Sequence, residues 1–276
     1  MIRSALMVAG DKLKHLQKIP SLECDIAIVN LEDGVFDKDK ARNLICDILP
    51  TLKNNKTKIV VRVNDLNTFG KEDIKAINTI KPYAIRIPKI KTADDVKVAC
   101  ELIDDDIEIH LSIETKEAFN NLPKLKVNNR VTTVYLGILD LLESLELPQS
   151  LVNLNNPTID YILSKFLIDS KIAGFTPISF VYQDYKNIDE FQAWCKKEKL
   201  LGLNAKGCIS PTQVDIVNKV FNTSNEEIEK ANYIIKQFEQ HKKNGITGFT
   251  DEKYGFIDEP IYKDALLIGL MKDLGA

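Results

Sequence analysis

The sequence predicts a (β/α)8 barrel, or TIM barrel, followed by a C-terminal helical extension. The chain has 276 residues, of which 44% are hydrophobic and 28% charged, so it is globular and long enough for one large α/β barrel. Short β-branched runs alternate with segments whose apolar residues have helical spacing, and this happens eight times. Several runs, such as Ile26–Val29 and Val134–Leu136, are apolar throughout, which is typical of parallel strands covered on both faces.

The alternation predicts eight strands in chain order. They are expected near Ser4–Ala9, Asp25–Leu31, Lys58–Val63, Tyr83–Pro88, Glu108–Glu114, Thr132–Leu139, Gly174–Phe180 and Leu201–Ile209. Eight β/α units within about 215 residues match the size of a (β/α)8 barrel. A doubly wound sheet is the alternative, but neither a G-x-G-x-x-G after the first strand nor a P-loop supports it.

The pattern changes after the eighth unit, so we expect a barrel over residues 1–223 and an extension over residues 224–276. Ser224 is a good N-cap, and the amphipathic segment from Asn225 has acids in its first turn, which predicts a helix. A loop containing Gly245, Gly248 and Gly255 is expected next, and then a final helix from about Pro260. The pattern indicates an appendage and not a second domain.

Composition excludes several classes of partner. There are 37 Lys and Arg residues against 40 Asp and Glu residues, so the chain offers no basic surface for nucleic acid. The longest apolar runs have about seven residues, whereas a membrane span needs roughly 20. The N-terminal segment is typical of a first strand and not of a secretion signal. Five scattered cysteines without C-x-x-C spacing predict reduced thiols. We therefore expect a cytoplasmic protein without a membrane or nucleic-acid partner.

Charged residues gather where the predicted strands end, and in a barrel these ends surround one cavity. They are Glu32, Asp33, Arg62, Lys89, Glu114 and Asp140, with the segment 206–213 after the last strand. Glu114 and Asp140 end successive strands, whose tips would lie about 5 Å apart. Two ionised carboxylates so placed repel each other unless a cation neutralises them. Mg²⁺ would do so, and an acid–base dyad sharing one proton is the competing interpretation.

Three further side chains admit a structural or a chemical role. Arg62 leaves an apolar strand and must meet an anion, either a substrate carboxylate or a carboxylate from the neighbouring strand end, Glu32 or Asp33. Lys89 could form a Schiff base only in a desolvated pocket, and beside Glu114 we expect it to stay charged. His110 lies in mid-strand, where we expect a buried side chain with a partner and not a catalytic one.

The ordered set of motifs resembles the citrate lyase β-subunit-like branch of the HpcH/HpaI aldolase superfamily, and is most similar to the citramalyl-CoA lyases. The resemblance spans nearly the whole chain, and the set of motifs carries it, since none is specific alone. The motifs are Arg3–Gly10, Leu31–Val35 with Lys40–Arg42, Val61–Asn64, Ile87–Lys89, Ile113–Thr115, Gly137–Asp140, Lys206–Gln213 and Gly255–Pro260.

The resemblance implies roles for the charged residues. Glu114 and Asp140 would ligate Mg²⁺, which holds the carboxylate and carbonyl oxygens of a 2-oxo acid, and Arg62 would bind the same group. Glu32, Asp33 and Lys89 would line the substrate site. Asp258 would be the acid–base group supplied by a neighbouring subunit, which implies a homotrimer or hexamer.

The reaction implied is a Mg²⁺-dependent C–C cleavage of a 3-hydroxyacyl-CoA of the citramalyl-CoA, malyl-CoA or citryl-CoA type to acetyl-CoA and a 2-oxo acid. Three positions depart from the pattern of the family: Asn30 replaces an Asp, Ala205 a Gly and Ser210 a His. Two alternatives follow. The chain would be the β subunit of a citrate lyase complex that acts on an acyl-carrier thioester, or a catalytically relaxed homologue with a binding or assembly role.

Overall fold

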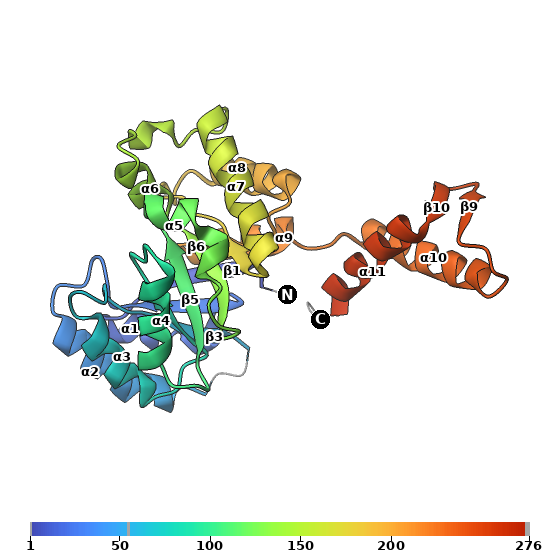
Figure 1. The fold of residues 1–276 in the computed structure, drawn as a ribbon. Helices are drawn as coiled ribbons and strands as arrows, with labels where there is room; N and C mark the ends of the chain where they lie inside the picture. Colours follow the sequence, from blue (N-terminus) through green and yellow to red (C-terminus); the bar gives the residue numbers. More distant parts are fainter. Residues whose placement is uncertain (1, 54–55, 274–276) are drawn as a thin grey trace. The chain divides into compact units, whose positions relative to one another are not determined.

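The computed structural model describes residues 2–53 and 56–273, with side chains as far as 269. Within it, residues Ile2–Phe221 form one unit, whose sheet has eight parallel strands (Figure 1). The strands are β1 (Ser4–Ala9), β2 (Ile26–Asn30), β3 (Lys58–Arg62), β4 (Ala84–Ile87), β5 (Glu108–Ile113), β6 (Val131–Leu136), β7 (Thr176–Ile178) and β8 (Lys206–Cys208). Their order in the sheet is β7-β6-β5-β4-β3-β2-β1-β8.

Ser179 joins the two edges of this sheet. Ser179 and Lys206 form a parallel bridge, in which the Ser179 N–H donates to the Ala205 carbonyl at 2.9 Å and the Gly207 N–H donates to the Ser179 carbonyl at 2.9 Å. The chain leaves each strand through a helix or turn and re-enters the next strand in parallel, as in a right-handed β/α barrel. The predicted (β/α)8 fold is therefore confirmed.

The helices and 3₁₀ turns of this unit follow the strands in sequence. The helices are α1 (Leu13–Leu16), α2 (Lys38–Ile48), α3 (Gly70–Asn78), α4 (Ala93–Leu102), α5 (Lys116–Asn120), α6 (Ile138–Ser144), α7 (Pro157–Ala173), α8 (Ile188–Leu201) and α9 (Pro211–Val220). The turns are η1 (Ile19–Ser21), η2 (Leu49–Thr51), η3 (Leu122–Leu125) and η4 (Gln149–Leu151).

Side-chain alternation along the strands divides the core into two parts. Outward positions such as Ala27 and Val29 join the large cluster between strands and helices. Inward positions such as Ile28, Val60 and Ala84 form a small apolar layer inside the barrel. Because strand side chains repeat every two residues, the next inward positions after these three are Asn30, Arg62 and Arg86. A polar layer thus lies on top of the apolar one, toward the carboxyl ends of the strands.

Two predicted strand boundaries were wrong. The sixth strand ends at Leu136, because Gly137 leaves the extended conformation (φ −90°, ψ 78°) and the apolar run after it forms α6. Short apolar runs do not separate strand from helix by periodicity alone. The eighth strand begins only at Lys206, since α8 continues to Leu201 and is terminated by Gly202 in the left-handed conformation.

Lys206, which we expected near the cavity, lies instead in the wall between β8 and α8. Its ammonium is fully buried, 2.5 Å from Glu198 Oε1 and 3.9 Å above the ring of Phe180. Burial of both partners makes this pair costly to break on one side. Its role is to attach α8 to the last strand of the barrel.

The second unit runs from Asn222 onward and has a small core of its own. It comprises α10 (Asn225–Lys242), β9 (Gly248–Asp251), β10 (Gly255–Asp258) and α11 (Glu259–Asp273). Ser224 caps α10 in a reciprocal capping box with Glu227, as the sequence predicts for the helix start. The expected glycine loop was wrong in part, because β9 and β10 pair as an antiparallel hairpin.

Within the described residues, no helix combines the length and apolar character that crossing a membrane requires.

A second polar cluster surrounds Glu108, the first residue of β5. His110 is fully buried and its Nδ1 lies 3.0 Å from the Tyr135 hydroxyl, which confirms the partnered, buried histidine expected there. The Thr132 hydroxyl donates to Glu108 Oε2 at 2.5 Å. Burial favours the neutral form of Glu108, but the neighbouring His110, Thr132 and Tyr83 outweigh it and lower its pKa to about 2.

Glu108→Gln is expected to destabilise the barrel at neutral pH by roughly 1–2 kcal/mol, the scale of a charged hydrogen bond lost inside a protein. Because the folded-state pKa of Glu108 lies below its ordinary value of 4.5, its contribution is complete above that value and disappears as the pH falls toward 2. The difference in free energy of unfolding between wild type and variant should shrink over this range. Urea titrations followed by the fluorescence of Trp194, the single and fully buried tryptophan, measure it.

The control is Glu101→Gln on the exposed surface of α4, which should leave the pH profile of wild type unchanged. A gap for Glu108→Gln that stayed constant from pH 7 to pH 2 would contradict this account of the cluster.

Candidate active site

A cavity of about 280 Å³ opens among the carboxyl ends of the barrel strands. Its polar lining residues include Asn30, Asp33, Arg62, Arg86, Glu114 and Asp140. Four of these were predicted as site residues from the sequence. Asn30 had been noted only as a departure from a motif, and Arg86 had not been singled out at all. The strand ends therefore converge as the barrel prediction requires.

Glu114, directly after β5, is the most buried carboxylate of this lining, with 4% of its surface exposed. Its Oε1 accepts a hydrogen bond from the Lys89 N–H at 2.7 Å. β5 pairs with β6 so that Glu114 lies beside Gly137, where a Cβ would be only 2.7 Å from Glu114 Oε2. Burial raises the pKa of Glu114; Arg86 and the Lys89 amide oppose this, and repulsion from Asp140 adds to it.

Asp140 lines the same cavity but from a different element than predicted. It belongs to the first turn of α6 and does not end a strand, since β6 stops at Leu136. An acid in the first helical turn is favourable because the helix dipole is positive there. Glu114 and Asp140 still line one cavity, although Asp140 belongs to a helix and not to a strand end.

The donor set formed by these two carboxylates fits a hard divalent cation. Among the described residues, neither Glu114 nor Asp140 has a Lys, Arg or His nitrogen within ion-pair distance, although Arg86 and Arg62 act on the charge of Glu114 from farther away. No group of three potential ligands from His, Cys, Asp and Glu occurs in residues 2–53 and 56–273. Mg²⁺ typically takes one or two protein carboxylates and completes its shell with water and substrate oxygens, which matches a two-carboxylate site.

Arg62 is held between two neighbours from β2 and the loop after it. Its Nε donates to Asn30 Oδ1 at 2.7 Å, and its Nη1 lies 3.1 Å from Glu32 Oε2. The ion pair with Glu32, one of the two roles foreseen for Arg62, is thus formed, while Arg62 also lines the cavity. Burial raises the pKa of Glu32 to about 7, although Arg62 opposes this. The carboxyl of Glu32 therefore titrates near neutrality.

Asn30 makes contacts that an ionised aspartate could not make. Its Nδ2 donates to the Asp33 carbonyl at 2.7 Å, while its Oδ1 also accepts from the Glu32 N–H at 3.1 Å. One amide side chain therefore orients Arg62 and closes the turn that carries Glu32 and Asp33. Only a side chain with both donor and acceptor can do this.

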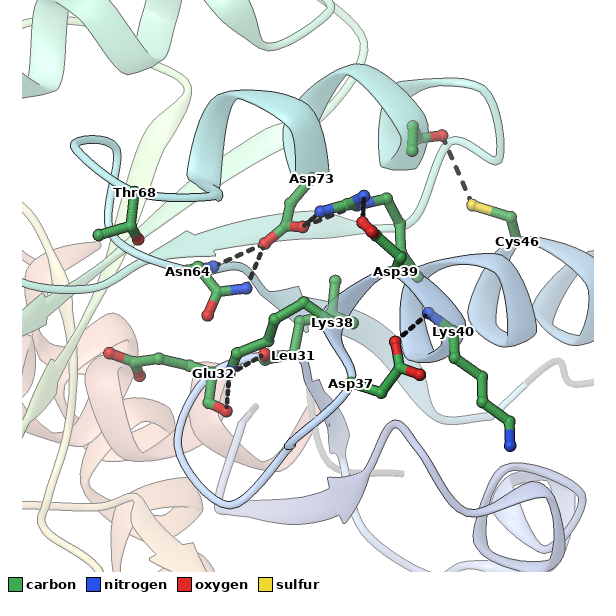
Figure 2. A network of polar contacts seen from close by, with 12 residues as sticks. Leu31, Glu32, Asp37, Lys38, Asp39, Lys40, Cys46, Asn64, Thr68 and Asp73 are labelled. Atoms are coloured by element: carbon green, nitrogen blue, oxygen red, sulfur yellow. Dashed lines mark hydrogen bonds and ion pairs between the residues drawn. The ribbon is translucent and has the colours of Figure 1, made fainter.

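The loops after β2 and β3 are also held by side chains that do not line the cavity (Figure 2). Lys38 Nζ donates to the main-chain carbonyls of Leu31 at 3.0 Å and Glu32 at 2.7 Å. The fully buried Asp73 accepts from the Asn64 backbone N–H at 2.9 Å and from Asn64 Nδ2 at 2.6 Å. These charge-assisted bonds fix the backbone on either side of Arg62.

Lys89 contributes its backbone more clearly than its side chain. It has a left-handed backbone (φ 55°), which aims its N–H at Glu114, and its side chain is exposed. Burial opposes protonation of its ammonium, but Asp140, Glu32 and Glu114 outweigh it and raise the pKa of Lys89. A charged, exposed lysine does not meet the requirement for Schiff-base formation. Its substrate-binding role stays a prediction.

The side chains of Ser210 and Asp258 each accept a hydrogen bond from a backbone N–H at the start of a helix. Ser210 caps α9 by accepting from the Gln213 N–H at 3.3 Å, so its hydroxyl serves the loop after the last strand. Asp258 ends β10 in the second unit, where its Oδ1 accepts from the Ile261 N–H at 3.3 Å. Its role at a neighbouring subunit stays a prediction.

The profile of the HpcH/HpaI aldolase/citrate lyase family matches residues 3–211. The chain belongs to this family. A (3S)-malyl-CoA thioesterase of Cereibacter sphaeroides (strain ATCC 17025) is 32% identical over 246 residues, which cover 88% of this chain and 85% of that protein. The human mitochondrial citramalyl-CoA lyase is 27% identical, over 95% of this chain and 83% of its own length.

Among solved structures, CitE from Mycobacterium tuberculosis in complex with magnesium, acetoacetate and coenzyme A superposes with a TM-score of 0.78 at 20% identity. The match covers 99% of this chain and 98% of that one. At this identity the likeness supports the fold of the HpcH/HpaI member described here.

Gly137→Ala is expected to weaken cation binding at this site without unfolding the barrel. The backbone of Gly137 (φ −90°, ψ 78°) is open to alanine, so the new Cβ acts by displacing the Glu114 side chain, whose Cβ and Oε2 would both lie 2.7 Å from it. We expect a loss of Mg²⁺ affinity of about tenfold or more, as for disturbance of a metal ligand's support, measured by isothermal titration calorimetry.

Gly174→Ala is the control, because Gly174 has φ +74° and a Cβ added there would meet nothing within 4 Å. It should cost about 1 kcal/mol of stability and leave Mg²⁺ affinity unchanged. Equal Mg²⁺ affinity for Gly137→Ala and wild type would show that Glu114 is not a ligand.

Proposed function

We propose that this protein is a Mg²⁺-dependent carbon–carbon lyase that cleaves a 3-hydroxyacyl-CoA to acetyl-CoA and a 2-oxo acid. The observation that carries the proposal is the convergence of Glu114 and Asp140, without a cationic partner among the described residues, in a cavity that Arg62 also lines. Membership of the HpcH/HpaI family and the relative named citramalyl-CoA lyase support the same reaction class.

Each of these side chains has a separate role in the proposed reaction. Glu114 and Asp140 hold the cation, and Asn30 and Glu32 hold the Arg62 guanidinium so that its remaining N–H groups can bind the carboxylate of the 2-oxo acid. When bound, Mg²⁺ supplies Lewis-acid stabilisation of negative charge on the oxygen that becomes the oxo group. The C3 hydroxyl must lose its proton to a base, its oxygen becomes the oxo group, and the electron pair of the broken C2–C3 bond leaves an enolate on the acetyl group, which must accept a proton from a positioned acid.

Asp258 is our candidate for that acid, supplied by the second unit of a neighbouring copy in a homotrimer or hexamer. Lys89 and Asp33 carry opposite charges at the rim and are proposed to meet the thioester part of the substrate, a CoA or acyl-carrier thioester. We keep the cytoplasm as the predicted location.

A second candidate reaction is hydrolysis of the thioester, because the relative at 32% identity is named a (3S)-malyl-CoA thioesterase. Its products differ: hydrolysis releases free CoA and leaves the hydroxy acid intact, whereas the lyase reaction yields acetyl-CoA and a 2-oxo acid. A carrier-bound substrate, as for a citrate lyase β subunit, would show as inactivity on free CoA esters and turnover of the acyl-carrier thioester.

Malyl-CoA, citramalyl-CoA and citryl-CoA with Mg²⁺ should give acetyl-CoA and a 2-oxo acid in equal amounts for at least one substrate. Glu114→Gln and Asp140→Asn should each lower kcat/KM by about 100-fold or more, the effect of losing charge stabilisation in the transition state. The matched control is Glu143→Gln, an exposed residue on the same helix as Asp140, with wild-type kinetics. Turnover by Glu114→Gln at the wild-type rate would refute the proposal.

Mixing two inactive variants tests whether Asp258 acts on a neighbouring barrel. Glu114→Gln lacks a working cavity and Asp258→Asn lacks the acid, so neither should work alone. In a ring of randomly mixed subunits, about a quarter of the sites combine an intact cavity with an intact neighbouring acid. Dissociation and reassembly of a 1:1 mixture should therefore recover about a quarter of wild-type activity. No recovery, with mixed assemblies verified by mass spectrometry, would place Asp258 in its own subunit's site or outside the reaction.

A further inference from the structure

Arg86 on β4 is a buried cation whose counter-ion is missing from the part of the chain that the structure describes. Only 5% of its surface is exposed. Its Nε donates to Ser112 Oγ at 2.9 Å, and its guanidinium carbon lies 4.1 Å from the centre of the Tyr135 ring. No carboxylate of residues 2–53 and 56–269 lies within 4 Å of its nitrogens. A neutral hydroxyl and an aromatic face are thus its immediate partners.

The guanidinium nevertheless stays charged. Burial, with a contribution from the nearby Arg62, outweighs the opposite effect of Tyr135, Glu114 and Glu32 and lowers the pKa of Arg86 to about 10, which leaves it protonated at neutral pH. A buried charge without a partner is destabilising, and proteins compensate for it with an opposite charge close by. Since the described chain supplies none in contact, an anionic ligand is the candidate.

The position of Arg86 puts such a ligand in the cavity already described. Arg86 lines it together with Glu114 and Asp140. Its Cα is in register with Arg62 on the adjacent strand, and its bond to Ser112 places its head group two residues below Glu114 along β5. Arg86 therefore forms the floor of the cavity, beneath the two carboxylates.

Arg62 and Arg86 differ in how many of their guanidinium nitrogens already have a partner in the protein. Arg62 already has Glu32 as a partner at 3.1 Å and is oriented by Asn30. Arg86 has no carboxylate in contact, since Glu114 and Glu32 act on its charge only from farther away. The Tyr135 ring lies against one face of its guanidinium, and its Nε donates to Ser112, which leaves its Nη groups for a planar acceptor. A carboxylate matches that fork in shape and charge, whereas an alcohol or an apolar group of the same size does not. Carboxylates are also the anions that the proposed substrate brings into this cavity.

We propose that Arg86 binds a second carboxylate of the substrate and thereby makes the site selective for a dicarboxylic 2-oxo acid of the oxaloacetate type. The inference rests on the proposed function, in which the first carboxylate belongs to Arg62 and the cation. It narrows the thioester to one that carries a carboxymethyl group on the carbon bearing the hydroxyl, as citryl-CoA does. Arg86 is in this view a specificity-determining residue.

Equilibrium binding of 2-oxo acids to the full-length protein with saturating Mg²⁺ tests this without turnover. The probes are oxaloacetate, 4-methyl-2-oxopentanoate, which has the same shape without the second charge, and pyruvate. Wild type should bind oxaloacetate about tenfold or more tighter than 4-methyl-2-oxopentanoate, the gain from one charge-assisted bidentate contact. Arg86→Met should remove this preference and change pyruvate affinity by less than about threefold.

Arg86→Lys serves if Arg86→Met does not fold, because it keeps the charge and loses the fork. It should lower the preference for oxaloacetate by about threefold or more. A wild-type preference below about twofold would overturn the inference without any variant, and so would an unchanged preference in Arg86→Met or Arg86→Lys. In either case the lyase proposal would stand, provided pyruvate binds with Mg²⁺. Failure of all three acids to bind would overturn the proposed function and this inference together.

Discussion

Glu114 is the carboxylate around which the mouth of the barrel is organised. The amide of Lys89 holds one of its oxygens, and the missing side chain at Gly137 makes room for the other. Both constraints come from backbone features, a left-handed residue after a proline and a glycine directly after a strand. A buried carboxylate fixed in this way near Asp140 is electrostatically strained, because each charge raises the cost of the other. The site therefore favours binding of a small cation over an empty state.

The positively charged residues of the cavity are also positioned by the backbone, through the register of the strands. Asn30, Arg62 and Arg86 occupy one level of neighbouring strands, since Asn30 pairs with Arg62 and Arg62 with Arg86 in the sheet register. Two guanidinium groups on adjacent strands repel each other, and the repulsion contributes to the lowered pKa of Arg86. Glu32 pairs with one of the two guanidinium groups. The difference in partners distinguishes Arg62, which Asn30 and Glu32 hold in place, from Arg86, whose Nε donates to the neutral hydroxyl of Ser112.

Much of this arrangement could be predicted from the sequence because strand ends in a barrel share one face. The apolar runs located all eight strands, and the charged residues after them located Arg62 and Glu114. Arg86 was missed because the segment from Tyr83 to Pro88 has the pattern of an ordinary strand. The period of two was the available signal, since it places Arg86 inward, two residues after Ala84. The helix at Asp140 and the hairpin before Asp258 were missed because short segments carry too little periodicity to decide their conformation.

The absence of charge on the Asn30 side chain matters because Arg86 lies on the same level of the barrel. An aspartate there would add a second carboxylate beside Arg62, on the same level as Arg86, and would satisfy part of the excess positive charge from within the protein. The amide instead accepts from Arg62 and donates to Asp33 while contributing no charge. The turn keeps its geometry, and the floor of the cavity keeps its positive potential. A neutral Asn30 and a cationic Arg86 are therefore two parts of one electrostatic arrangement, which directs the uncompensated charge to the ligand.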